Sequence, residues 1–260
     1  MALYDRIGTD YDVTRRADPY ITERLIHHLN PQPDGRYLDL GCGTGNYAIA
    51  IASVLRVEVH GIDQSRRMIC TAREKRSSVA WHCGDAEFLP FRENSFSGVM
   101  CILGMHHFKH LGSVFEEVFR VLEGGRFVIF TATQEQMRGY WLNRYFPNAM
   151  EKSIRQMLGL RSLIEQLRNA GFRHVESEAY RVTNSLQDLF LYSGKHRPEI
   201  YLDPRIRKGI STFANLADLG EVGRGCVELA SDIRSGRIQK VIHEAREREG
   251  DYLFVAAGTV

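Results

Sequence analysis

The sequence lacks the features that usually place a chain in a membrane or on nucleic acid. No apolar run approaches the roughly 20 residues that are needed to span a bilayer. The first residues, 1–6, contain no apolar core of a signal peptide, so we expect a cytoplasmic protein. A net charge of +2 over 260 residues gives no strong basic surface, which argues against a nucleic-acid partner.

Cysteine is scarce, and its spacing fits neither a zinc site nor a disulfide framework. The five cysteines are odd in number, and no two are separated as C-x-x-C. We therefore expect no metal, and we expect buried thiols of a reducing compartment. The cysteines are Cys42, Cys70, Cys83, Cys101 and Cys226.

A glycine-rich turn organises the rest of the chain. A short apolar run at 37–40 leads into glycine at every second position from 41 to 45, and residues 47–55 follow with helical spacing. This predicts a strand, a tight loop and a helix. A dinucleotide-binding fingerprint would place its third glycine at position 46. Because that residue is Asn46, the spacing argues against an NAD(P)-dependent oxidoreductase, which remains an alternative.

A second strand, at 57–63, ends in an acidic residue. In nucleoside-binding α/β units, an acidic side chain at this position accepts hydrogen bonds from ribose hydroxyls. Asp63 is the expected ribose ligand, and Gln64 stands beside it. A helix N-cap is the alternative role for Asp63, although Ser65 is better placed for it. Met68 is predicted to contact adenine or to be a core methionine.

The glycine turn resembles motif I of the class I S-adenosylmethionine (SAM) dependent methyltransferases. The matching residues are Asp39, Gly41, Cys42, Gly43 and Gly45, in the pattern D-x-G-x-G-x-G. In that family the loop passes under the methionine part of SAM. The resemblance therefore implies SAM as the cofactor, and these five residues as its contacts.

Two further segments carry the same resemblance. Residues 84–91 match the family segment G-D-A-x-x-L-P-F, which implies that Asp85 meets the adenine amine and that the backbone of Ala86 supports the ring. A turn-capping aspartate is the alternative. Many small-molecule methyltransferases also begin with a Tyr-Asp segment that folds over the pocket. That implies Tyr11 and Arg16 as contacts of the methionine carboxylate, although a solvated arm over 1–17 is the plainer interpretation.

A fourth strand, at 96–103, ends where ligands bind in open α/β sheets. Leu103 is its last residue and an expected cofactor contact. His106 is the candidate general base, because a neutral imidazole titrates near pH 7, and His107 is second. A base is needed only if the nucleophile carries a proton, and both histidines have structural roles as alternatives.

The predicted fold class is α/β: a Rossmann-like, doubly wound sheet of seven strands with a helical cap insertion. Residues 1–182 with 251–260 form the SAM-binding domain, and residues 183–250 form the cap. The aromatic-rich region 132–160 either shapes the substrate pocket or covers a sheet edge as a helical pair. With the cap, it predicts a mainly apolar pocket.

The resemblance, to the branch that contains ubiquinone and menaquinone methyltransferases, implies a SAM-dependent methyltransferase acting on a small-molecule acceptor. The methyl group would pass by direct displacement, and the protein would contribute positioning and exclusion of water. A non-catalytic SAM-binding protein is the second alternative, beside the oxidoreductase.

Overall fold

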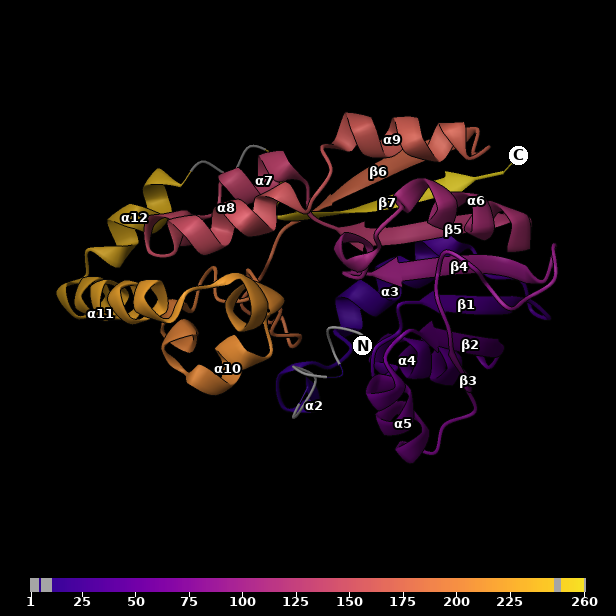
Figure 1. Cartoon of the computed structure of the whole chain (residues 1–260), viewed down its shortest axis with the longest axis horizontal. Coiled ribbons are helices and arrows are strands. Elements are labelled where there is room, and N and C mark those ends of the chain that lie inside the picture. Colours follow the sequence, from indigo (N-terminus) through magenta and orange to yellow (C-terminus); the bar gives the residue numbers. More distant parts are fainter. Residues whose placement is uncertain (1–4, 6–10, 246–248, 260) are drawn as a thin grey trace.

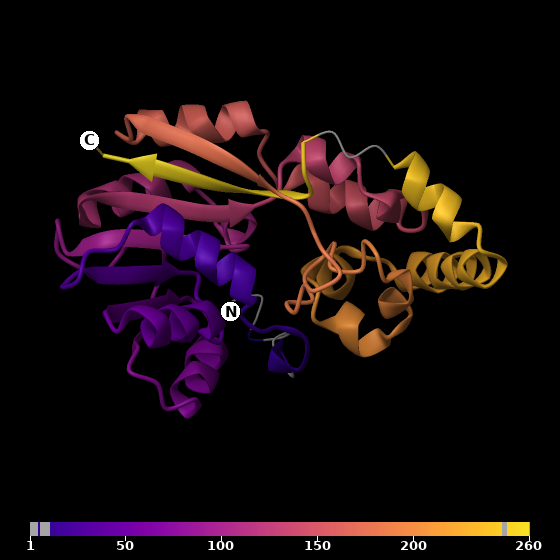
Figure 2. The same ribbon diagram turned by 180° about the vertical axis from the view of Figure 1, so that it is seen from behind.

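The computed structural model describes residue 5, residues 11–245 and residues 249–259. Of the N-terminal arm expected over 1–17, residues 1–4 and 6–10 lie outside the described part. Figure 1 shows two lobes: a twisted sheet between helices, which we call the sheet lobe, and a group of helices beyond one end of the sheet, which we call the helical lobe. Figure 2 shows the same division from behind.

The sheet has seven strands in the order β3-β2-β1-β4-β5-β7-β6. Strands β1 to β5 run parallel, and β7 is antiparallel to its neighbours β5 and β6. Because the order reverses at β1, the predicted doubly wound, Rossmann-like sheet is confirmed. The strands are β1 (Arg36–Leu40), β2 (Glu58–Asp63), β3 (Ala80–Cys83), β4 (Phe96–Ile102), β5 (Leu122–Thr131), β6 (His174–Tyr180) and β7 (Tyr252–Gly258).

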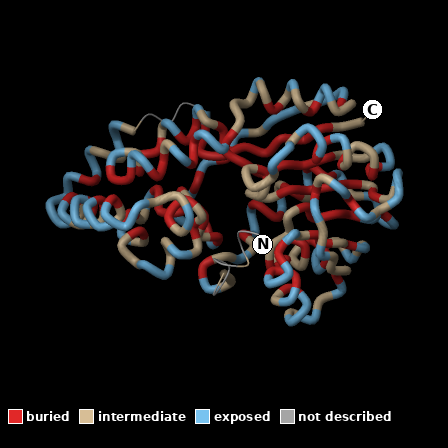
Figure 3. The backbone as a smooth tube through the Cα atoms, viewed as in Figure 1, coloured by how far each residue is buried: buried red, intermediate tan, exposed pale blue. Residues whose placement is uncertain are grey.

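Helices cover both faces of the sheet, and the side chains of β5 point alternately to one face and to the other. Phe127 and Ile129 enter the core on the side of α6 and α9, whereas Val128 and Phe130 enter the core under α3 and α4. Figure 2 shows α3 lying across its face, and Figure 3 shows the buried strands between exposed helices. The helices of this lobe are α3 (Pro19–Leu29), α4 (Asn46–Leu55), α5 (Arg66–Glu74), α6 (Leu111–Val121) and α9 (Leu160–Asn169).

The helical lobe combines two segments that are far apart in the sequence. The first, after β5, packs its α8 against η4 of the second, which lies between β6 and β7. Both lie beyond the carboxyl ends of the parallel strands (Figure 1). The first segment holds α7 (Gln134–Arg138), η2 (Trp141–Arg144) and α8 (Pro147–Arg155), and the second holds η3 (Pro198–Leu202), α10 (Pro204–Lys208), η4 (Thr212–Leu216), α11 (Leu219–Ser235) and α12 (Ile238–Glu244).

Three sequence-based expectations differ from the structure. The apolar residues of 186–191 recur at helical spacing, which predicts a helix, but the structure forms a loop there with a bend at Asp188. Strand β5 begins at Leu122 instead of after a turn at 123–125, and it passes this stretch as an irregularity in the pairing with β4. The cysteines are all free, but Cys70 and Cys83 are exposed, so the expectation of buried thiols was wrong for these two.

Candidate active site

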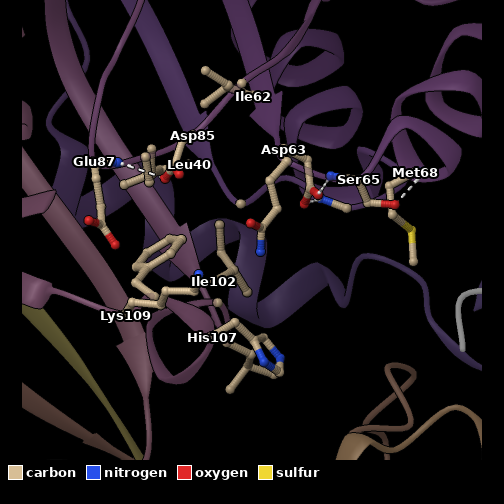
Figure 4. Close-up of a pocket in the computed structure, with 18 of the residues that line it drawn as sticks. Leu40, Ile62, Asp63, Ser65, Met68, Asp85, Glu87, Ile102, His107 and Lys109 are labelled. Carbon is tan, nitrogen blue, oxygen red and sulfur yellow. Dashed lines mark hydrogen bonds between the residues drawn. The ribbon is translucent and has the colours of Figure 1, made fainter. Parts of the chain in front are cut away.

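The carboxyl ends of β1, β2 and β4 surround a pocket, which we call the Asp63 pocket (Figure 4). The glycine turn forms one wall. Gly41 and Gly43 have φ angles of +69° and +54°, which only glycine adopts at little cost. The N–H groups of Gly41 and Cys42 donate to the carbonyl oxygen of Ile62 at 2.9 and 3.0 Å, so the turn is fixed to β2.

The side chain of Asp63, the predicted ribose ligand, is held in place by two backbone groups. Its two carboxylate oxygens accept from Gly43 N at 3.0 Å and from Ser65 N at 2.8 Å. Burial raises the pKa of Asp63, and the two backbone donors oppose this rise. A carboxylate accepts about four hydrogen bonds, so it retains capacity for a ribose diol. Ser65 caps α5, as the sequence indicated.

The other predicted contacts of the Asp63 pocket lie around it. Asp85 lines it and also accepts from Glu87 N at 3.0 Å, so the turn-capping role and the pocket role coexist (Figure 4). Met68 lines it while being 1% exposed, so it is a buried methionine at the edge of the pocket, and its contact with adenine stays a prediction. The predicted residues that line it are Tyr11, Gly41, Gly43, Asp63, Gln64, Met68, Asp85, Ala86, Leu103 and His107.

Gly45 is not among the residues that line the Asp63 pocket, and the structure gives it a packing role. A Cβ atom at this position would lie 2.0 Å from the ring of Trp81. Its φ of +79° also disfavours any other residue. Gly45 therefore lets β3 approach the start of α4, and it acts on the pocket only through the shape of the turn.

A second hollow, the Asp39 pocket, lies on the other side of the glycine turn. Tyr11, Arg15, Asp39, Cys42 and Asp188 are among the residues that line it. Burial raises the pKa of Asp39 to about 8, with a contribution from the charge of Asp63. A bound ammonium group would favour the ionised carboxylate, so this pocket suits the charged amino-acid end of a ligand.

Arg15 is the arginine that the structure brings inward, whereas the predicted Arg16 is exposed at the rim of the Asp39 pocket. Arg15 Nε and Nη2 donate to Asp188 at 2.5 and 3.1 Å, and Nη1 donates to the Tyr11 hydroxyl at 2.9 Å. Arg15 lies four residues after Tyr11, which is the spacing of side chains on one helix face, and this signal could have identified it.

The two histidines face different hollows. They form part of η1 (Met105–His107), with ring centroids 3.9 Å apart. His107 lines the Asp63 pocket, and burial lowers its pKa to about 4. His106 lines a third hollow, the His106 pocket, and burial lowers its pKa well below the usual value. Both imidazoles are therefore neutral at pH 7.

The three hollows meet at a few residues. Leu103 lines both the Asp63 and the His106 pockets, and Arg15 lines both the Asp39 and the His106 pockets. Leu103 has a φ of +51°, a conformation that non-glycine residues rarely adopt and that concentrates at functional sites. The walls of the His106 pocket are mainly apolar, as the sequence predicted: Leu103, Ala132, Met137, Met157, Phe190, Leu191, Ile210 and Tyr252.

Two features that the described residues lack bear on the type of site. Within 5, 11–245 and 249–259, no group of three His, Cys, Asp or Glu side chains could hold a metal ion. No helix in this part of the chain is long and apolar enough to cross a membrane.

The donor set fits SAM. The carboxylates of Asp63, Asp85 and Asp39 line adjoining pockets, where they can accept hydrogen bonds from hydroxyl, amine or ammonium groups, and Arg15 offers a cation beside them. The sheet defines a Rossmann-like α/β protein, and these groups lie at the carboxyl ends of its strands, where that class binds its ligands.

Comparison with known proteins identifies the family. Residues 38–125 match the model of the methyltransferase domain. The demethylmenaquinone methyltransferase of Listeria welshimeri is 30% identical over 208 residues, which cover 66% of this chain and 87% of the relative. That of Oceanobacillus iheyensis is 28% identical, over 60% of this chain and 76% of the relative.

Solved structures agree. A putative methyltransferase from an antibiotic biosynthesis pathway of Anabaena variabilis is 32% identical with a TM-score of 0.83, covering 94% of this chain and 98% of that one. Phosphoethanolamine N-methyltransferase 2 of Haemonchus contortus, solved with S-adenosylhomocysteine, shares the fold at 21% identity, with a TM-score of 0.60 over 94% of this chain and 53% of that one. The chain therefore belongs to the class I SAM-dependent methyltransferases: it is a methyltransferase, and SAM is its cofactor.

Proposed function

We propose that this enzyme methylates a small, mainly apolar molecule that binds in the His106 pocket. The observation that carries the proposal is the junction at Leu103, where this apolar pocket meets the cofactor side of the site. Relatives named for the methylation of demethylmenaquinone support a small-molecule acceptor. The five free cysteines support the expected cytoplasmic location, because unpaired thiols are typical of reducing compartments.

The residues divide into three groups by role. Asp63 and Gln64 hold the ribose, and Asp85, Ala86 and Met68 hold the adenine. The glycine turn and Asp39 hold the amino-acid end, together with Tyr11, from the N-terminal helix α2 (Tyr11–Thr14), and Arg15, which directly follows that helix. When bound, SAM supplies an electrophilic methyl group on a sulfonium.

The protein's part in the reaction is positioning, exclusion of water and management of one proton. Both lobes contribute walls to the His106 pocket, so the acceptor is oriented between them. His106 is neutral at pH 7, so it can accept a proton from a hydroxyl or amino nucleophile. We also propose that residues 183–250 act as the cap, together with the helices of 134–155.

The test is to supply SAM with a labelled methyl group and to follow the label into separated fractions of a cell extract. We expect the label in the low-molecular-mass fraction, in products soluble in organic solvent. Label confined to RNA or protein would contradict a small-molecule acceptor. Binding of SAM without transfer to any fraction would favour the non-catalytic alternative.

A further inference from the structure

A pair of buried hydroxyls in the His106 pocket has no role in binding the cofactor. Ser153 Oγ, on α8, and Thr212 Oγ1, on η4, are 2.9 Å apart. The two residues are 6% and 2% exposed. The hydrogen bond between them uses one of their two hydroxyl hydrogens, and the described residues provide no further hydrogen bond to either group. The pair therefore has one O–H left to donate into the pocket.

A second polar group, on the imidazole of His106, lies on the side of this pocket nearer the cofactor site. Nδ1 of His106 is buried and has no hydrogen-bond partner among the described residues. An unsatisfied buried polar atom costs about 1–3 kcal/mol, so a ligand that bonds to it is favoured. The His106 pocket thus has polar groups contributed by two different lobes, with apolar walls around them.

The charge of the pocket selects against ionic ligands. Arg15 is the one formally charged side chain among the described residues that line it, and Asp188, 1% exposed, neutralises it. A ligand ammonium would find no carboxylate among these residues, and a phosphate would compete with Asp188 for the guanidinium. A buried charge without a partner is costly, so the acceptor is uncharged.

The nucleophile follows from the weakness of the base. An imidazole that is buried away from water holds a proton poorly, so it suits a phenol, with a pKa near 10, better than an aliphatic alcohol. Flat aromatic rings also pack well against the thioethers and rings of Met137, Met157 and Phe190.

We propose, on the basis of the function proposed above, that the acceptor is an uncharged phenol whose ring also carries a carbonyl oxygen. Its hydroxyl lies against His106 Nδ1, and its carbonyl accepts from the Ser153–Thr212 pair. The phenol oxygen forms a bond to the methyl carbon as the sulfonium–methyl bond breaks. The electron pair of that bond returns to sulfur, and the phenol proton passes to Nδ1 and then to solvent.

The first experiment compares four acceptors with the full chain and SAM, by mass spectrometry of the products. The probes are para-hydroxyacetophenone, para-ethylphenol without the carbonyl, acetophenone without the hydroxyl, and phosphoethanolamine. We expect a methyl ether from para-hydroxyacetophenone, with kcat/KM about 10-fold above that for para-ethylphenol because one hydrogen bond is lost. The other two compounds should give no product.

The second experiment changes the hydroxyl pair. Thr212→Val with Ser153→Ala should lower kcat/KM for para-hydroxyacetophenone about 10-fold and leave para-ethylphenol little changed. Thr212→Ser should retain the wild-type preference. The matched control is Thr183→Val, because Thr183 and Ser185 form an exposed hydroxyl pair at 2.8 Å, outside the pocket. His106→Gln should abolish turnover of both phenols while SAM still binds.

The outcomes separate this inference from the proposed function. Failure of a folded protein to bind SAM would contradict the function itself. SAM binding with methylation of phosphoethanolamine, or with no product from either phenol, would overturn the acceptor class and leave the proposed function standing. Equal loss with both phenols in the Ser153/Thr212 variant would overturn the role of the hydroxyl pair.

Discussion

The two lobes of this enzyme are held together in different ways. Around the glycine turn of the sheet lobe the contacts are close in sequence: Asp63 accepts from Gly43 N across 20 residues and from Ser65 N across two. The helical lobe is joined to the N-terminal segment by a distant contact, that of Arg15 with Asp188, 173 residues away. Local spacing therefore encodes the glycine turn and Asp63, whereas the contacts of the helical lobe bring together segments that are far apart in the sequence. The predictions that follow test this difference.

The largest effect is expected where the N-terminal helix joins the second segment of the helical lobe. Asp188→Ala removes the carboxylate that pairs with the largely buried guanidinium of Arg15 and that accepts from the Tyr47 hydroxyl. We expect the free energy of unfolding to fall by about 3 kcal/mol, measured by urea denaturation. Glu244→Ala, which removes an ion pair with the exposed Lys240, is the control and should change little. An equal effect of both substitutions would contradict the comparison.

A matched pair of glycines tests the lobes separately. A Cβ at Gly45 would lie 2.0 Å from Trp81, and a Cβ at Gly225 would lie 2.3 Å from the Tyr145 carbonyl oxygen. Each Gly→Ala change should destabilise the protein by about 2 kcal/mol. Gly45→Ala should weaken SAM binding, whereas Gly225→Ala should raise KM for the acceptor and leave SAM binding unchanged. If both substitutions weakened the binding of SAM and of the acceptor to the same extent, the two lobes would not act on separate ligands.

A smaller effect concerns pH. The pKa of Asp39 is raised in the folded protein to about 8, so the folded state binds more protons than the unfolded state between about pH 4 and 8. Stability of the free enzyme should therefore fall as pH rises through this window, by about 2 kcal/mol between pH 6 and pH 8. Asp39→Asn should remove this part of the slope in urea denaturation. Asp34→Asn, in an exposed turn, should keep it.

The smallest effect is expected on the surface of the sheet lobe. Gly112 lies in α6, and a Cβ there would meet nothing within 4 Å. Gly112→Ala should stabilise the protein by about 0.5 kcal/mol, because it restricts the unfolded chain. A loss of stability in thermal unfolding would contradict the open space around this position.

The sequence was sufficient to predict the doubly wound sheet and the glycine turn, because each rests on a short spacing with its own physical reason. Asp63 and Asp85 were expected at the ligand end of the sheet, and both line the pocket there, while their contacts with ribose and adenine stay predictions. The adjacent residues Arg15 and Arg16 show the limit of sequence-based prediction. Arg15 lies inward and Arg16 is exposed, and only the helical spacing between Arg15 and Tyr11 could have distinguished them.

The acceptor side could be predicted only in its general character. An apolar pocket was expected from the aromatic residues around 140–146 and the helical insertion, but these aromatic residues do not line the His106 pocket, whose apolar walls include Met137, Met157 and Phe190. Ser153 and Thr212 could not be paired from the sequence, since their contact depends on the packing of α8 against η4, 59 residues apart. Residues 186–191 have apolar residues at helical spacing but form a loop, in which Asp188 is bonded to Arg15 and Tyr47.

The central claim is that the carboxyl end of the sheet binds SAM through Asp63. Its most direct test is calorimetric titration with SAM and S-adenosylhomocysteine of the wild type, Asp63→Ala and the exposed control Asp34→Ala. We predict micromolar binding by the wild type and the control. The affinity should fall about 100-fold in Asp63→Ala, because this substitution removes the charged acceptor of two hydrogen bonds from the ribose hydroxyls. Unchanged affinity in a folded Asp63→Ala variant would contradict this account.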